Sequence, residues 1–272
     1  MNKRKTIDII AEIGQNFNGD IDLAKEMIKQ AANAGANIVK FQLYDPAKRS
    51  DIKTHKWADI LLQSKITRRQ VFLLKDECDK FNVSFLASVF DSERVQWCED
   101  IKMEAYKIAS KSIYDVELAR AVAVTGKPVI LSYGMFKEAD LPSIILEWYK
   151  DYDKHVRDIK LTKLYCISKY PADLMDMNFM FESGRQLDFI DMTVTIPVAY
   201  SIFESDYQGY SDHSIGLTAC KTAMSLGARV IEKHLTMDKN MAGPDHIHSC
   251  TPDEMADLCK FRDEVEMILY GK

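Results

Sequence analysis

Two histidines, His213 and His234, close short apolar runs in the second half of the chain, in the stretches GYSDHSIG (209–216) and EKHLTMDKN (232–240). A single histidine is more often a hydrogen-bonded structural residue than a metal ligand. If the two runs are neighbouring strands, however, their imidazoles can share one divalent cation, with water and substrate oxygens as further ligands. Mn²⁺, Fe²⁺, Co²⁺ and Zn²⁺ all suit such a site, whereas the lack of an obvious cysteine ligand disfavours a closed structural zinc site.

The chain alternates apolar, β-branched runs with segments of helical period along almost its whole length. The runs predicted as strands are residues 7–13, 37–42, 83–89, 105–110, 128–134, 160–168, 209–213 and 228–234. Helix starts are predicted at Asp20, at the capping box Thr67–Gln70, and at a second capping box, Thr251–Glu254, whose helix is expected to pack through Met255, Leu258, Val265 and Ile268. This α/β alternation over 272 residues favours a (β/α)₈ TIM barrel that forms a single domain, residues 1–272. A doubly wound open sheet is the alternative, which the strand count and the absence of a GxGxxG motif disfavour.

Composition and charge are those of an ordinary globular protein, with 47% hydrophobic residues, 28% charged residues and a formal net charge of -5. This charge argues against a general nucleic-acid or membrane-surface binder. There is no apolar run near eighteen residues, and the N-terminus has no signal-peptide pattern. The six cysteines show no paired spacing. Together these features predict a cytoplasmic protein with reduced thiols.

Polar side chains gather at the carboxyl ends of the predicted strands, which is where TIM barrels place their active sites. They are Glu12, Lys40 with Gln42, Ser88, Lys107 with Ser110, Ser132, Ser211 with His213, and Glu232 with His234. A lysine that points into a barrel mouth is costly unless it meets an anion. The two lysines and the surrounding hydroxyls therefore predict a site that holds a phosphate and a carboxylate.

Successive motifs of the chain resemble those of the sialic acid synthase family. They are AEIGQNFNGD (11–20), IVKFQ (38–42), YKIAS (106–110), KPVILSYGM (127–135), SKYP (168–171), GYSDHSIG (209–216), VIEKH (230–234) and GPDH (243–246). The resemblance covers nearly the whole chain in the correct order. Members of this family condense phosphoenolpyruvate with an N-acylated hexosamine, or its 6-phosphate, to make nine-carbon 2-keto acids such as neuraminic, legionaminic and pseudaminic acids, and relatives act in spore-coat polysaccharide synthesis.

The resemblance implies a role for each matched residue. Phosphoenolpyruvate would be bound by Lys40, Ser88, Lys107, Ser110, Ser132 and Ser211, and the sugar by Gln42 and Tyr170. His213 and His234 would hold a divalent metal, Mn²⁺ in the first place, with Mg²⁺, Co²⁺, Fe²⁺ or Zn²⁺ as alternatives. Glu12, Asp245 and Glu232 would be catalytic, the first two facing the sugar as acid or base and Glu232 beside the metal. The implied chemistry is attack of the enol carbon on the sugar aldehyde, addition of water at C2 and loss of phosphate.

Three departures from the family pattern concern the sugar acceptor. Family members usually continue into a C-terminal antifreeze-like domain that supplies an arginine to the partner subunit, and we expect this domain to be absent. Lys111-Ser112 stands where the family has glycine and an acidic residue, and Ala87–Phe90 and Ser132–Gly134 replace Ser-Thr-Pro-Phe and Ser-Thr-Gly. We therefore expect intact donor chemistry with a changed acceptor. The family is commonly dimeric, which leaves a homodimer possible.

Two stretches remain open to more than one interpretation. The loop 45–60 carries Lys48, Arg49, Lys53, His55 and Lys56, which suits either an acidic or phosphorylated acceptor or a plain solvated loop. The segment 179–208 is longer than a helix and a loop require, and it predicts an extra strand or a lid that takes over part of the missing domain's role.

The leading functional interpretation is a metal-dependent, phosphoenolpyruvate-condensing synthase of the nonulosonic-acid type. A second interpretation keeps the donor but uses a shorter aldose phosphate, as the 3-deoxy-octulosonate and heptulosonate synthases do. A third, from a different class, is a catalytically inactive ligand-binding paralogue. The acceptor, the metal and the oligomeric state are not determined by the sequence.

Overall fold

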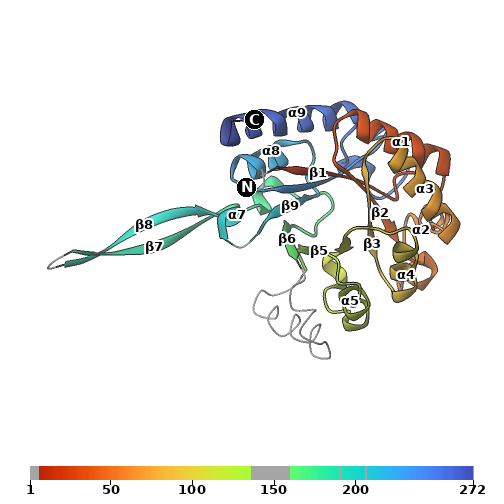
Figure 1. The fold of residues 1–272 in the computed structure, drawn as a ribbon, viewed down its shortest axis with the longest axis horizontal. Coiled ribbons are helices and arrows are strands. Elements are labelled where there is room, and N and C mark those ends of the chain that lie inside the picture. The colour runs from red at the N-terminus through yellow and green to blue at the C-terminus, as the bar shows by residue number, and fades with distance from the viewer. Residues whose placement is uncertain (1–5, 136–159, 190–191, 206, 272) are drawn as a thin grey trace.

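The structure is a computed structural model that describes residues 6–135, 160–189, 192–205 and 207–271, with only the backbone described for residues 181–200 and 204–205. Eight parallel strands close into a barrel in the order β1-β10-β9-β6-β5-β4-β3-β2 (Figure 1). The barrel strands are β1 (Asp8–Gly14), β2 (Ile38–Leu43), β3 (Ser84–Val89), β4 (Tyr106–Ile108), β5 (Val129–Tyr133), β6 (Leu161–Cys166), β9 (Gly209–Asp212) and β10 (Val230–His234). The predicted TIM barrel is therefore confirmed, and each predicted strand is present.

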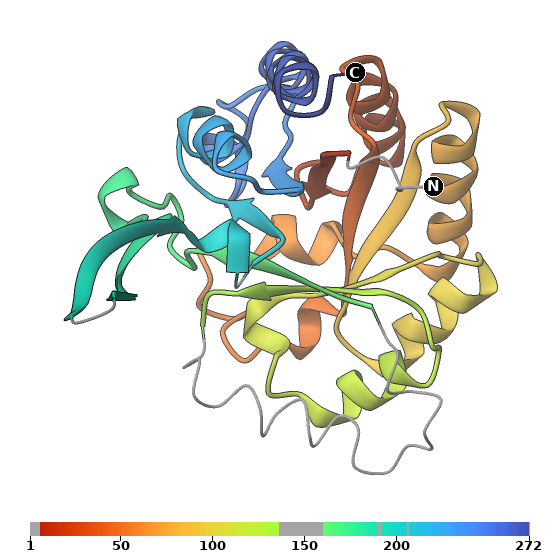
Figure 2. The same cartoon turned by 60° about the vertical axis from the view of Figure 1, so that its left-hand side comes forward.

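Helices cover the outside of the barrel (Figure 2). They are α1 (Ile21–Asn33), α2 (Ala58–Gln63), α3 (Arg68–Lys80), α4 (Ser92–Asp100), α5 (Val116–Ala123), the short α7 (Ile202–Ser205), α8 (Thr218–Ser225) and α9 (Pro252–Tyr270). The last helix, α9, packs against both α1 and α8, so the ring of helices closes next to its beginning. None of the described helices is long and apolar enough to span a membrane.

The predicted helix starts are confirmed at atomic detail. The Asp20 side chain accepts hydrogen bonds from the first backbone amides of α1, and both Thr67 and Thr251 form the reciprocal capping box with the residue three positions on. These side chains satisfy amides that the helix cannot pair itself. Along α9, Met255, Leu258 and Val265 are buried as expected. The expectation for Ile268 was wrong, since 80% of this residue is exposed on the last turn of the helix.

A layer of apolar side chains fills the barrel directly below the site. It consists of Ile10, Leu86, Ile130 and Leu164, with Ile38, Ala105 and Val230 packed against them. Each of these residues lies two positions before a polar or thiol side chain of the same strand (Glu12, Ser88, Ser132, Cys166, Lys40, Lys107 and Glu232). Because successive side chains on a strand alternate, residues two apart share a face. The two layers explain why the strands place a polar ring on an apolar floor.

Gly209 occupies the corresponding position of the eighth strand, two residues before Ser211. A Cβ there would lie 2.1 Å from the carbonyl oxygen of Val230 and 2.7 Å from Cδ2 of Leu164. We expect Gly209→Ala to lower the free energy of unfolding by about 3 kcal/mol or more, because the barrel wall has to move. The measurement is urea unfolding followed by circular dichroism. Gly126→Ala is the comparison: nothing lies within 4 Å of its Cβ position, so its cost is limited to the left-handed φ of 67°, about 1 kcal/mol. Equal stability losses in both variants would contradict the steric explanation.

The segment between β6 and β9 forms an antiparallel hairpin of β7 (Met180–Phe189) and β8 (Met192–Ser201). It extends away from the barrel in Figure 1. The expectation of additional strand structure in 179–208 is confirmed. None of the described residues of β7 or β8 lines the cavity analysed below, and the idea that this segment substitutes for a further domain stays a prediction.

Candidate active site

A cavity of about 540 Å³ opens at the carboxyl ends of the barrel strands. All of the site residues predicted from the sequence line it: Glu12, Lys40, Gln42, Ser88, Lys107, Ser110, Ser132, Tyr170, Ser211, His213, Glu232, His234 and Asp245. The strand register explains this convergence. Glu12 is level with Lys40 on one side and with His234 on the other, Ser88 with Lys107, and Ser211 with Glu232.

Glu232 is the electrostatic centre of the cavity floor. Its carboxylate lies 3.1 Å from Lys107 Nζ and 3.6 Å from Lys40 Nζ, and it accepts a 2.8 Å hydrogen bond from the Ser211 hydroxyl. Burial alone would raise the pKa of Glu232, but the charges of Lys107 and Lys40 outweigh burial and hold this pKa well below its usual value. Glu232 is therefore ionised at neutral pH and balances two buried lysines.

Glu12 and Asp245 differ from Glu232, because their pKa values are raised and not lowered. Glu12 pairs with Lys40 Nζ at 2.9 Å and accepts a hydrogen bond from Gln42 Nε2 at 2.8 Å, but burial still raises its pKa. Burial, followed by the negative charge of Glu12, raises the pKa of Asp245 to about 7. Asp245 is therefore suited to exchange protons near neutrality, and Glu12 accepts a proton more readily than Glu232 does.

Several hydroxyls of the cavity still have a hydrogen to donate. Ser88 Oγ accepts from Lys40 Nζ at 2.9 Å, and Ser110 Oγ accepts from the backbone amide of Gly134 at 2.8 Å. Ser132 Oγ is buried and has no hydrogen-bond partner among the described residues. A buried hydroxyl without a partner is unfavourable. These groups, with Lys40 and Lys107, form a set of donors suited to an anion.

The two histidines lie at the ends of adjacent strands, with ring centroids 5.6 Å apart. His213 Nδ1 is 2.8 Å from the carbonyl oxygen of Ile167. A carbonyl only accepts, so Nδ1 carries the proton and the other ring nitrogen keeps a free lone pair. His234 Nδ1 is buried and has no hydrogen-bond partner in the described part of the chain. Burial lowers the pKa of both imidazoles, that of His234 strongly, which favours the neutral form that binds metals.

These observations fit a metal held by two imidazoles, with its other positions taken by water or substrate. Within the ranges that the structure describes, no group of three or more His, Cys, Asp or Glu side chains has the arrangement of a metal site. A site closed by protein ligands alone is thus not formed there, and an open site is the one that these residues suit.

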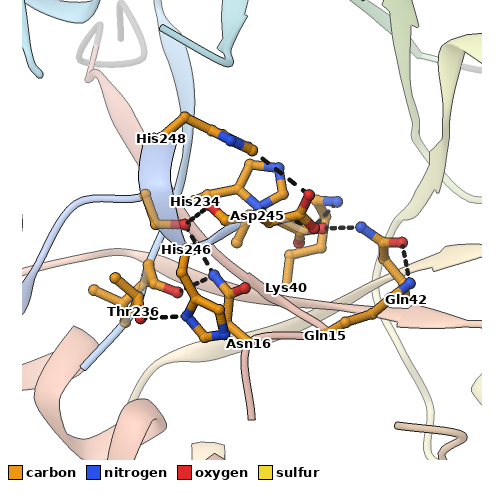
Figure 3. Close-up of polar contacts among 12 residues, drawn as sticks. Gln15, Asn16, Lys40, Gln42, His234, Thr236, Asp245, His246 and His248 are labelled. Atoms are coloured by element: carbon orange, nitrogen blue, oxygen red, sulfur yellow. Dashed lines mark hydrogen bonds and ion pairs between the residues drawn. The ribbon is translucent and has the colours of Figure 1, made fainter. Parts of the chain in front are cut away.

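His248 was not identified from the sequence, although it follows the predicted Asp245 within the same GPDHIH stretch. It is fully buried, and its ring lies 5.0 Å from that of His234. Figure 3 shows Asp245 between the two imidazoles, with Asp245 oxygens 3.9 Å from His234 Nδ1 and from His248 Nε2. Further cavity residues that were not predicted as site residues are Gln15, Leu61, Ala109, Met135, Cys166, Ser168 and Pro244. Cys166 follows the strand alternation but is a thiol, Leu61 lies on α2, and the other five lie within the quoted motifs but outside the barrel strands, where alternation does not mark them.

The basic loop after β2 divides into two groups. Arg49, His55 and Lys56 line the cavity together with Trp57, whereas Lys48 and Lys53 are exposed and do not. Lys111, which follows β4, lines the same cavity. Arg49 and His55 are partly buried at the cavity, whereas Lys56 lines it but stays exposed. The choice between an acceptor-binding loop and a solvated one stays a prediction.

Comparison with known proteins gives a consistent result. The NeuB family model matches residues 27–272. An uncharacterised protein of Methanocaldococcus jannaschii is 36% identical over 96% of this chain and 71% of its own length, and the N,N'-diacetyllegionaminic acid synthase of Campylobacter jejuni is 33% identical over 94% and 75%. The structure of a sialic acid synthetase from Leptospira borgpetersenii, in complex with citrate, superimposes with a TM-score of 0.80 at 30% identity and covers 99% of this chain and 87% of that one. A 3-deoxy-D-arabino-heptulosonate 7-phosphate synthase from Thermotoga maritima shares the fold, with a TM-score of 0.64 at 13% identity.

Proposed function

The chain belongs to the NeuB family, and from this premise and the cavity described above we propose that it joins phosphoenolpyruvate to an N-acylamino sugar or a related aldose. The product is a 2-keto-3-deoxy sugar acid, and phosphate is released. The observation that carries the proposal is the buried group of Lys40, Lys107 and serine hydroxyls, including the unpartnered Ser132, on the cavity floor. This group matches the phosphate and carboxylate of the donor.

The reaction balances with one water molecule. C3 of phosphoenolpyruvate forms a bond to the aldehyde carbon of the sugar, and the aldehyde oxygen gains a proton and becomes a hydroxyl. Water adds its oxygen to C2 and loses one proton. The bond between C2 and the phosphate oxygen then breaks, the C2 hydroxyl becomes the keto oxygen, and its proton leaves with the released phosphate. One proton must therefore be delivered and one removed near the carbon atoms that react.

Residues of this chain can meet both requirements. Lys40, Lys107 and the serines hold the donor against the cavity floor, which fixes C3 in the direction of the acceptor. Burial raises the pKa values of both Glu12 and Asp245, that of Asp245 to about 7, so Asp245 can give or take a proton near neutral pH and Glu12 is more readily protonated than a free carboxylate. Gln42 orients Glu12 through its 2.8 Å hydrogen bond. Tyr170, whose ring centroid lies 4.2 Å from that of His213, offers a surface against which the sugar packs.

A divalent cation bound by His213 and His234 would polarise the aldehyde of the acceptor as a Lewis acid. Mn²⁺ is our first choice, with Co²⁺, Fe²⁺, Zn²⁺ and Mg²⁺ as alternatives. The neutral imidazoles and the free lone pairs described above support this proposal.

Phosphate release from phosphoenolpyruvate tests the function. We expect release only when an acceptor aldose and a divalent metal are both present, with N-acylamino hexoses or their phosphates as the best acceptors. Preference for a shorter aldose phosphate, such as a pentose or tetrose phosphate, would move the chain to the octulosonate or heptulosonate type. Donor binding without release with any of these acceptors would instead indicate a ligand-binding protein.

A further inference from the structure

Two cationic side chains line the cavity and repel each other electrostatically. Arg49 comes from the loop after β2, and Lys111 belongs to the short 3₁₀ turn Ser110–Ser112 that follows β4. Lys111 Nζ lies 4.6 Å from the ring centroid of Phe90 and 5.8 Å from that of Tyr44. These cation–π contacts place the ammonium group beside two aromatic rings at the cavity, although the side chain as a whole remains exposed.

The two cations are only partly compensated. Arg49 donates two hydrogen bonds to Asp51, at 2.9 and 2.7 Å, while Lys111 has no ion pair or hydrogen bond with any described residue. Partial burial, followed by repulsion from Arg49, lowers the pKa of Lys111. Lys56, which lines the same cavity, also has no ion pair within the described ranges, although it packs on Trp57. This part of the mouth thus has an excess of positive charge, which a bound anion would relieve.

The positive charges of Arg49 and Lys111 are not part of the donor site. Lys40 and Lys107 are buried on the floor and paired with Glu12 and Glu232. Lys111 and Arg49 instead act on Asp245, because both of their charges lower the pKa of this carboxyl group against the effects of burial and Glu12. The cation pair therefore belongs to the Asp245 side of the cavity, where the proposed function puts the sugar acceptor.

We propose that Arg49 and Lys111 bind an anionic substituent of the acceptor, a phosphate ester or a carboxylate at the end of the sugar remote from its aldehyde. The proposal rests on the function proposed above and specifies its substrate class. Arg49 keeps N–H donors beyond the two that Asp51 occupies, and Lys111 has all three of its own available. When a guanidinium and an ammonium group of the protein both contact one anionic group, they select its geometry and balance its charge.

The test compares matched acceptors that differ only in the anionic group. One pair is an N-acylhexosamine and its 6-phosphate, and the other is the same hexosamine and its 6-carboxylate. We expect the wild-type kcat/KM to favour an anionic member by about tenfold or more, and the pair with the larger ratio identifies the group as phosphate or carboxylate. Lys111→Met keeps the apolar stem and should lower kcat/KM for that anionic acceptor about 10- to 100-fold. The values for the neutral acceptor and the KM for phosphoenolpyruvate should not change.

Two further variants separate the charge from the structure. Lys111→Arg should retain much of the preference. Lys53→Met, on the loop of Arg49 but outside the cavity lining, should behave as wild type. Equal kcat/KM values within both pairs would overturn the proposal, and so would a raised KM for phosphoenolpyruvate in Lys111→Met, since the cations would then serve the donor.

Failure of the proposed function gives a different result, namely no turnover with any acceptor. In that case, calorimetry with the hexosamine 6-phosphate and the 6-carboxylate tests whether Arg49 and Lys111 form an anion site. Binding of either that is weakened about tenfold in Lys111→Met supports the pair as an anion site, and binding unaffected by the substitution rejects it.

Discussion

Replacing His213 or His234 by alanine is expected to abolish metal-dependent turnover, by about a hundredfold or more, while the barrel remains folded. Both imidazoles line the cavity at the ends of adjacent strands, and each has a ring nitrogen without a hydrogen-bond partner among the described residues. The polar layer rests on the apolar floor of Ile10, Leu86, Ile130 and Leu164, which neither substitution touches. Losing one ligand should therefore empty the metal site without removing the core.

Bound metal per protein chain, measured by elemental analysis after gel filtration, is the readout that does not depend on activity. The unfolding midpoint shows whether each variant is folded. His246→Gln is the matched control, because His246 lies outside the cavity lining and is hydrogen-bonded to Thr236 at 2.7 Å. Full activity and full metal content in either alanine variant would refute the two-ligand site.

Replacing Lys40 or Lys107 should chiefly weaken donor binding. We expect the dissociation constant for phosphoenolpyruvate to rise about 10- to 1,000-fold, because truncating one partner of a buried charge pair leaves both the ligand anion and a carboxylate without compensation. Lys107 is the cleaner case, since Glu232 is its one ion-pair partner among the residues that the structure describes, whereas Lys40 also contacts Glu12 and Ser88. Calorimetry with phosphoenolpyruvate measures the change.

Loss of Lys107 also leaves Glu232 less compensated, which lowers stability by about 3 kcal/mol or more. The double variant Lys107→Met with Glu232→Gln should recover stability but not donor binding, which separates the two effects. Lys127→Met removes another lysine–glutamate contact, to Glu99 at 2.6 Å and away from the cavity, and should leave the affinity unchanged. Unchanged donor affinity in Lys40→Ala and Lys107→Met alike would argue against their role.

Most of the site residues predicted from the sequence follow from the alternation of side chains along the strands. Glu12, Lys40, Ser88 and Glu232 each follow an apolar residue two positions earlier, so a single parity rule places them on one barrel layer. The rule ends where the strand ends. Strand β4 stops at Ile108, two residues before the predicted boundary, because Ser110 already belongs to a 3₁₀ turn. That turn is what directs Lys111 to the mouth.

Loop residues were harder to predict because no periodicity governs them. His248 reaches Asp245 and His234 only because the segment between β10 and α9 folds back over the barrel end (Figure 3). Asn16 holds this segment by donating hydrogen bonds to the carbonyl of Leu235 and the hydroxyl of Ser249. Arg49 was noted as one of five basic residues in its loop, but its position on the cavity depends on contacts with Asp51 and Tyr44. The contacts of Asn16 are long-range and those of Arg49 are local but without a period, so neither leaves a pattern that predicts the position of the side chain.

The central claim is that a carbon–carbon bond forms between the donor and a sugar, and the fate of carbon 3 of phosphoenolpyruvate tests it most directly. With [3-¹³C]phosphoenolpyruvate, metal and an acceptor, the proposed reaction predicts label at C3 of a 2-keto-3-deoxy sugar acid, one equivalent for each phosphate released. Carbon NMR of the reaction mixture makes this measurement. Release of phosphate with all of the label in pyruvate would contradict the account, since the chain would then hydrolyse the donor without condensing it.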